Sequence, residues 1–222
     1  MEVGKIGVHN GACMAAADFF EIYITGSGGH AAIPDLTIDP IPCGAAIVQS
    51  LQSIVSRRIT ALEPAVVSVT IFDAGSALNV IPGAARLGGT ARSFSPEIRK
   101  FLEESIRDIT QSTAKAFNCG VEIDWQSGYP PTVNHADESS RAVSVASDVL
   151  GAENIITDLP PSMGAEDFAF MLEEKPGSYI WLGAGPAKEG AMLHNDRYDF
   201  NDDVLATGAS YWARLVESEL PK

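Results

Sequence analysis

The chain has 222 residues, of which 45% are hydrophobic and 20% charged, and it carries a formal net charge of -14. Its length and its mean hydropathy of +0.07 predict a globular protein with one large core or two smaller ones. The negative charge argues against nucleic acid or an anionic membrane surface as a partner, because like charges repel.

Residues 17–129 predict four strands and two helices in the order βαββαβ. Strands are indicated where apolar residues alternate with polar ones, and helices where apolar residues recur every three or four positions. Ser95 suits an N-cap, and Glu103 and Arg107 are spaced to pair along the second helix. The elements are a strand at 19–25, a helix at 39–58, a strand at 64–72, an extended segment at 84–94, a helix from 95 to about 118 and a strand at 121–126. This order is typical of the ferredoxin-like arrangement, with two helices on one face of an antiparallel sheet.

The remaining residues predict an incomplete α/β unit. Residues 130–222 indicate helices at 137–150, 165–172 and 202–219 but one clear strand, at 178–182, and residues 1–15 add at most one strand, near 5–8. A lone strand leaves its backbone groups unpaired unless another sheet accepts it. We therefore predict an α+β protein with a ferredoxin-like domain at 17–129, flanked by residues 1–16 and 130–222, which look like parts of an incomplete second domain.

The loop at 24–35, Ile-Thr-Gly-Ser-Gly-Gly-His-Ala-Ala-Ile-Pro-Asp, combines three glycines with a histidine. It lacks the Lys and Ser/Thr of a phosphate-binding loop and the last glycine of a dinucleotide fingerprint. It also lacks the flanking glycines of a nucleophile elbow around Ser27. Phosphate, dinucleotide and serine-nucleophile sites are therefore disfavoured here.

The cysteines and the polarity of the chain favour a reducing compartment. Three cysteines at wide spacing, without a CxxC pair, indicate neither a disulfide framework nor a thiolate metal site. No basic leader and no apolar run of about 20 residues is present. We expect a cytoplasmic protein.

The four histidines are scattered, so spacing alone indicates no metal site. His194 lies between an apolar approach and a polar loop, a suitable place for a single ligand. A zinc site needs three or four ligands, and the sequence shows no second one at matching spacing. Further along, Asn201 suits the N-cap of the last helix, with Asp202 and Asp203 in its first turn.

Five motifs occur in order along the chain. They are Gly-Gly-His-Ala-Ala-Ile-Pro at 28–34 with Asp-Pro-Ile at 39–41, Asn-Val-Ile-Pro at 79–82, Gly-Thr-Ala-Arg-Ser-Phe at 89–94, Met-Gly-Ala-Glu-Asp-Phe-Ala-Phe at 163–170, and Leu-His-Asn at 193–195 with Tyr-Asp-Phe-Asn-Asp at 198–202. Together they resemble the amidohydrolase branch of the di-zinc metallopeptidases, which includes aminoacylases, hippurate hydrolase and indole-acetyl-amino-acid hydrolases, and the resemblance covers almost the whole chain. It implies a catalytic domain interrupted by a ferredoxin-like lid that serves as the dimerisation domain: residues 1–16 would be a remnant of the catalytic domain, 17–129 the lid and 130–222 the C-terminal part of the catalytic domain.

The resemblance also implies roles for six residues. His30 would stabilise the oxyanion of the tetrahedral intermediate, reaching from the lid of one subunit into the active site of the other. Asn79 and Arg92 would bind substrate, Arg92 by a two-pronged contact to an α-carboxylate. Gly164 and Glu166 would line the substrate cleft, and His194 would be a metal ligand.

Two of these assignments have a structural alternative. Asn79 would serve equally well as the cap of a turn, and Arg92 as the partner of an acidic residue across the sheet. Asp35 departs from the family pattern, which often has histidine at that position, and the resemblance carries no metal role onto His9.

The family's Gly-Cys-Gly-His-Asp segment, its paired glutamates and a further histidine have no counterpart in the sequence. In the family, two zinc ions, or manganese or cobalt, activate a water whose proton a glutamate accepts. We therefore expect the full-length form to be a homodimeric, metal-dependent amidohydrolase that cleaves N-acyl amino acids or small peptides, and the chain as given to be a truncated, inactive fragment without bound metal. The alternative is a non-catalytic dimerisation or binding module that docks on a partner chain.

Overall fold

The computed structural model describes residues 1–186 and 190–220, which form two compact units. The first, here called the terminal unit, comprises Met1–Cys13, Thr132–Ser162 and the residues from Asp167 onward. The second, called the sheet unit, comprises Met14–Pro131 and Met163–Glu166. No helix among the described residues is both long enough and apolar enough to cross a membrane.

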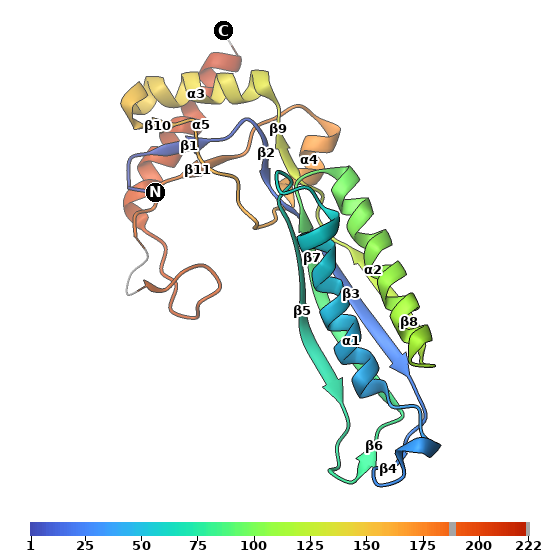
Figure 1. Cartoon of the computed structure of the whole chain (residues 1–222). Coiled ribbons are helices and arrows are strands. Elements are labelled where there is room, and N and C mark those ends of the chain that lie inside the picture. Colours follow the sequence, from blue (N-terminus) through green and yellow to red (C-terminus); the bar gives the residue numbers. More distant parts are fainter. Residues whose placement is uncertain (187–189, 221–222) are drawn as a thin grey trace. The chain divides into compact units, whose positions relative to one another are not determined.

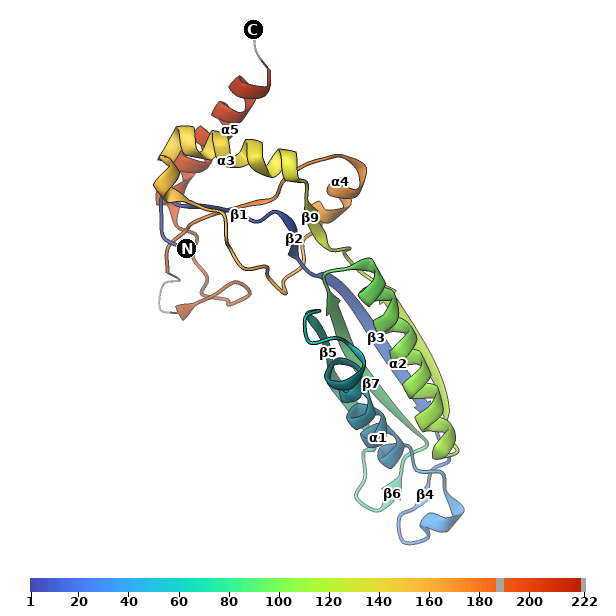
Figure 2. The ribbon, with the colours of Figure 1, turned by 45° about the horizontal axis from the view of Figure 1, so that its top comes forward.

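The sheet unit is a four-stranded antiparallel sheet in the order β5-β7-β3-β8, with two long helices packed on one face (Figures 1 and 2). The long elements alternate as the sequence predicts, and two short strands form a separate ribbon at one end. Their bounds are β3 Ala16–Thr25, β4 Gly29–His30, α1 Pro40–Ser53, β5 Ala65–Ala74, β6 Val80–Ile81, β7 Ala84–Ser93, α2 Pro96–Ala116 and β8 Gly120–Ser127.

Strand β3 is paired along its length. It pairs with β7 from Ala16 opposite Ser93 to Thr25 opposite Ala84, and with β8 from Asp18 to Thr25. The alternation read from the sequence is observed, because Phe20, Ile22 and Ile24 are all buried under the helices. The core of this unit is therefore built around one central strand.

The glycine-rich segment at 84–94 forms the second central strand of the sheet, β7. A side chain at Gly89 would have its Cβ atom 2.4 Å from the Phe20 ring and 2.3 Å from the carbonyl oxygen of Ser68. A side chain at Gly88 would press on Ile71, 3.1 Å away. The glycines that weaken the strand signal are thus required by close packing across the sheet.

Both helices of the sheet unit begin at side-chain caps. Asp39 accepts a hydrogen bond from the Ile41 amide at the start of α1, and Ser95 accepts one from the Ile98 amide at the start of α2, as predicted. Helix α1 ends in a π-helical turn at Ile54–Arg58. Helix α2 is followed by Asn118 in a left-handed conformation, with φ of 57°, which turns the chain into β8.

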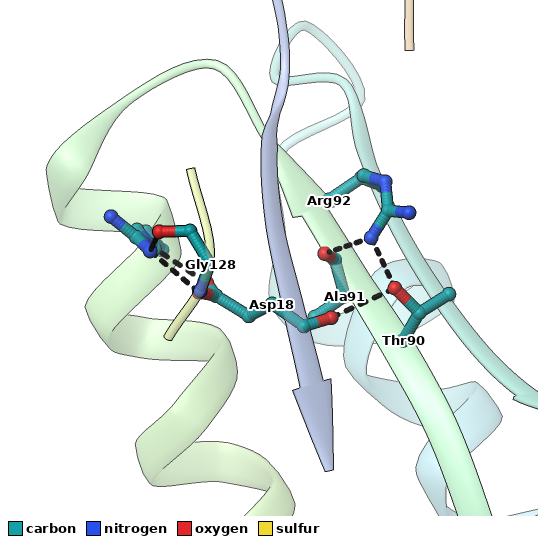
Figure 3. A network of polar contacts seen from close by, with 6 residues as sticks. Asp18, Thr90, Ala91, Arg92 and Gly128 are labelled. Carbon is teal, nitrogen blue, oxygen red and sulfur yellow. Dashed lines mark hydrogen bonds and ion pairs between the residues drawn. The ribbon is translucent and has the colours of Figure 1, made fainter. Parts of the chain in front are cut away.

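A buried ion pair ties α2 to the central strand. Asp18 is 2% exposed, and its two carboxylate oxygens accept hydrogen bonds from Arg99 at 2.8 and 2.6 Å. The Gly128 amide also donates to this carboxylate, at 3.1 Å (Figure 3). The charge is therefore compensated by a two-pronged guanidinium contact and a backbone donor.

The terminal unit has more strands than the sequence predicts. Strand β1 pairs in parallel with β10 and antiparallel with β11, and β2 pairs with β9. The prediction of one strand in each flanking segment is therefore wrong, because these strands are only two to four residues long and too short to show a period. The bounds are β1 Ile6–Val8, β2 Gly11–Met14, β9 Thr132–Asn134, α3 Ala136–Leu150, β10 Ile155–Ile156, α4 Phe168–Glu174, β11 Ile180–Leu182 and α5 Leu205–Glu219.

Two details of the predicted organisation differ from the structure. Residues 163–166, expected in the C-terminal region, join the sheet unit, where the Ala15 amide donates to the Gly164 carbonyl at 2.9 Å. Helix α4 consequently begins at Phe168 and not near residue 165. The predicted cap at Asn201 is observed, because its side chain accepts from the Asp203 amide at the turn that leads into α5.

The buried ion pair predicts a large stability difference between two arginines of α2. Arg99→Ala should lower the free energy of unfolding by about 3–5 kcal/mol, because it leaves Asp18 charged and buried without its cation. Arg107→Ala, which removes an i,i+4 pair with Glu103 at the surface, should cost no more than ~1 kcal/mol. Urea unfolding followed by circular dichroism measures both, and equal losses would contradict the proposed role of the pair.

The packing at β7 predicts that a single added methyl group destabilises the sheet. Gly89→Ala should cost about 1–3 kcal/mol because the Phe20 ring and the neighbouring strand must shift. The matched control is Gly120→Ala on the edge strand β8, where the nearest atom to a new Cβ is 3.7 Å away. A thermal shift of the Gly89 variant no larger than that of the control would show that the close approach is not restrictive.

Candidate functional site

His30 and Asn79 lie together at the end of the sheet unit that carries the β4–β6 ribbon. His30 is directly opposite Val80 in this ribbon, and the Ala31 amide donates to the Asn79 carbonyl at 3.1 Å. Both side chains are exposed. The Asn79 side chain makes no hydrogen bond within the described residues, so the alternative of a turn cap is not observed.

Arg92 is held on the face of the sheet opposite the helices. Its Nη1 donates to the Thr90 hydroxyl and, at 3.0 Å, to the Ala91 carbonyl (Figure 3). Its guanidinium lies 5.4 Å from the centre of the Phe19 ring. Thr90 in turn donates to the Asp18 carbonyl at 2.8 Å. The alternative of a cross-sheet ion pair is not observed among the described residues.

The surroundings of Arg92 suit recognition of an anion. Burial lowers the pKa of Arg92, while the charge of Asp18 acts in the opposite direction. The contacts within the described chain use Nη1 alone, so Nε and Nη2 can receive a carboxylate in the two-pronged geometry that favours arginine.

Gly164 and Glu166 lie at the same end of the sheet unit as Arg92. The Gly164 carbonyl accepts from Ala15, which immediately precedes β3, and Arg92 is paired with Ala17 near the start of that strand. Glu166 is half-buried. The predicted site residues of the sheet unit therefore form two groups, one at each end of the sheet.

The two groups are separated by the length of β3. From Ala17 to Thr25 a rise of about 3.3 Å per residue gives roughly 26 Å, and His30 lies beyond the end of the strand. His30 and Arg92 of one chain therefore cannot contact the same small substrate.

His194 belongs to the terminal unit, on an exposed loop where its backbone is left-handed with φ of 68°. Over residues 1–186 and 190–220, no group of three or more histidine, cysteine, aspartate or glutamate side chains is arranged to hold a metal ion. One imidazole does not fit the three or four donors that a zinc ion requires. The described residues therefore do not fit a two-metal centre by themselves.

Cys13, Cys43 and Cys119 are all buried, and none of them forms a disulfide within the described residues. Burial raises the pKa of the Cys43 thiol to about 12, with a further contribution from Cys119. Cys119 also donates weakly to the Asp39 carbonyl at the start of α1, at 3.9 Å. The Cys43 thiol is therefore part of the core and not a nucleophile, because the reactive form of cysteine is the thiolate.

Cys43 should therefore resist alkylation by iodoacetamide at pH about 8 in the folded chain and react in urea, which peptide mass spectrometry can follow. Equal alkylation rates in the folded and unfolded chain would contradict the raised pKa of this thiol.

The raised pKa of Cys43 also predicts a contribution to the free energy of unfolding that is fully present below the ordinary pKa of 9.0 and is lost as the pH rises to about 12. Cys43→Ala should remove this pH-dependent contribution.

A family model for the peptidase family M20/M25/M40 matches residues 2–218. N-acetylcysteine deacetylase of Bacillus subtilis is 38% identical over 216 residues, which cover 97% of this chain and 55% of that protein. Hippurate hydrolase of Campylobacter jejuni is 36% identical, over 96% of this chain and 55% of that protein. The crystal structure of the Bacillus subtilis YXEP protein, described as a dinuclear metal binding peptidase, superposes with a TM-score of 0.77 at 29% identity, covering 99% of this chain and 54% of that one.

The chain belongs to peptidase family M20/M25/M40, as the motif resemblance predicted. It spans about half the length of the curated relatives it matches.

Sequence reasoning missed the residues that position Arg92 and His30. Thr90 lies two residues before Arg92 on the same face of β7, and Phe19 of β3 is directly opposite Thr90, so correct strand registration would have found both. Ala32 contributes through its backbone amide, for which the side chain gives no signal.

Proposed function

We propose that this chain supplies the substrate-binding and oxyanion-stabilising part of a metal-dependent amidohydrolase that releases amino acids from N-acyl conjugates. Family membership and the names of the relatives support the reaction class. The observation that carries the substrate assignment is the Arg92 guanidinium, fixed through Nη1 and by Phe19, with its other edge available to an α-carboxylate.

The role that we propose for each site residue follows from the chemistry of its side chain or backbone. Arg92 binds the carboxylate of the amino-acid portion, and Asn79 offers an amide to a polar group of the substrate. His30 donates a hydrogen bond to the oxygen that becomes negative when the amide carbonyl is attacked. Gly164 and Glu166 line the cleft next to Arg92.

The separation of His30 from Arg92 supports a homodimer in which each active site takes its histidine from the other chain. In this proposal the sheet unit is the lid and dimerisation domain.

We also propose that the enzyme works in the cytoplasm with two divalent ions, zinc or else manganese or cobalt, with His194 as one ligand. The other donors and the general base come from polypeptide outside these 222 residues, since the described residues do not form such a centre. Alone, this chain would then be inactive.

A second candidate is a binding module that docks on a partner chain without catalysis. The terminal unit favours it, because apolar side chains on α4, on α5 and at the C-cap of α5 are widely exposed: Met171 63%, Trp212 62%, Val216 55% and Leu220 72%. A groove of about 550 Å³ beside Phe168 and Trp212 runs along this surface. Large exposed apolar areas of this kind are typical of protein interfaces.

Adding the missing part of the protein distinguishes the two candidates. The chain is fused to the portion of Bacillus subtilis N-acetylcysteine deacetylase that the match does not cover, and hydrolysis of N-acetyl amino acids is measured with and without divalent metal. We expect hydrolysis by the fusion with metal and none by the chain alone. A folded, metal-loaded fusion without hydrolysis would favour the binding module, and hydrolysis by the chain alone would overturn the division of the metal centre.

The active fusion also tests the role of Arg92. Arg92→Ala should raise KM for N-acyl amino acids by about 10- to 100-fold, the value of a lost charged hydrogen bond, and should barely affect the corresponding amino-acid amides, which lack the carboxylate. Arg57→Ala, at an exposed position on the π-helical turn, is the matched control. An equal KM increase for both substrate series would exclude carboxylate recognition.

A further inference from the structure

The turn that follows β4 folds back onto His30. The Ile33 amide donates to the His30 carbonyl at 2.9 Å, and the Ala32 amide donates to the Nδ1 atom of the His30 ring at 3.1 Å. The same segment is tied to the opposite loop by the Ala31 amide, which donates to Asn79. The carbonyl group and one ring nitrogen of His30 are thus both held by amides of the turn that follows it.

The contact at Nδ1 determines which ring nitrogen carries the proton. A neutral imidazole has one N–H group and one acceptor nitrogen. Because Nδ1 accepts a hydrogen bond from Ala32, it is unprotonated, and the proton is on Nε2. A proton on Nδ1 would face the Ala32 N–H directly, and the contact would be lost.

The Nε2–H group is available to an acceptor from outside the described chain. The His30 side chain is exposed, and no partner of Nε2 is found in the part of the chain that the structure describes. Val80 lies directly across the ribbon and is 50% exposed, so its side chain is an apolar neighbour on the same face. A group that meets this face encounters a hydrogen-bond donor beside an apolar surface.

We propose that the backbone amide of Ala32 is a positioning group that fixes His30 as a neutral Nε2–H donor. This inference rests on the proposed function, because stabilising a developing negative oxygen requires a donor that is already oriented. With the other tautomer, Nε2 would present a lone pair to the oxyanion and repel it. The amide therefore makes His30 suited to this role without a charged partner.

The hydrogen bond can be detected directly by NMR in the chain as it exists. With 15N-labelled protein at pH about 8, where an ordinary imidazole is neutral, we expect a coupling across the hydrogen bond between the Ala32 amide nitrogen and Nδ1 of His30. The two-bond ring correlation should show a proton on Nε2 alone. The His30 signals are assigned by their loss in His30→Gln. A proton on Nδ1, or a tautomer mixture without the coupling, would overturn the proposal.

Two substitutions at one position supply the matched comparison. Ala32→Pro removes the amide hydrogen, and Ala32→Gly keeps it. The proline variant should lose the pure Nε2–H form and show a mixture of tautomers, and the glycine variant should retain it. Identical tautomer ratios in both variants would overturn the proposal, and if the proline variant does not fold, the coupling in the unmodified chain decides. Failure of the fusion enzyme to hydrolyse amides would refute the proposed function and leave this result unaffected.

Discussion

The hydrogen-bond ladders on both sides of β3 are the constraint on which the candidate site depends. They run from Asp18 to Thr25 against β8 and over the whole strand against β7, so β3 cannot bend or slip without losing both neighbours. Arg92 and Gly164 are attached at one end of this strand and His30 follows the other. The fold thereby separates two groups that the proposed reaction needs on one substrate.

Asp18, buried at one end of the sheet, supports both the packing of the fold and the proposed substrate-binding residue Arg92. Asp18 directs its carboxylate to Arg99 and Gly128, and its carbonyl accepts from Thr90, the residue that holds Arg92 (Figure 3). One well-fixed residue thus anchors a helix on one side of the sheet and orders a cation on the other. Indirect support of this kind, by satisfied buried polar groups, is a general means of pre-organising a side chain such as Arg92, which we propose to bind substrate.

The sequence predicts the sheet unit well because its elements are long enough to show a period and are bounded by explicit signals, such as Ser95 and Pro96 before α2. The terminal unit is predicted less well, since β2 and β10 have four and two residues and are defined by their partners. In the same way, the motifs indicate His30 and Arg92 as candidate site residues, but only the strand register shows that they lie at opposite ends of the sheet unit. The contact from Ala32 depends on backbone direction, which no side-chain pattern reports.

The central claim is that His30 and Arg92 serve one substrate only when they come from two chains. Mixing two impaired variants of the fusion enzyme, assayed at a substrate concentration well below KM, tests it most directly. A hybrid of His30→Ala and Arg92→Ala chains has one site with both residues intact and one site with neither. After random exchange of subunits we predict recovery of about a quarter of the unmodified activity, because half of the dimers are hybrids with one working site each. Hybrids that form but are no more active than the two separate variants would contradict the account.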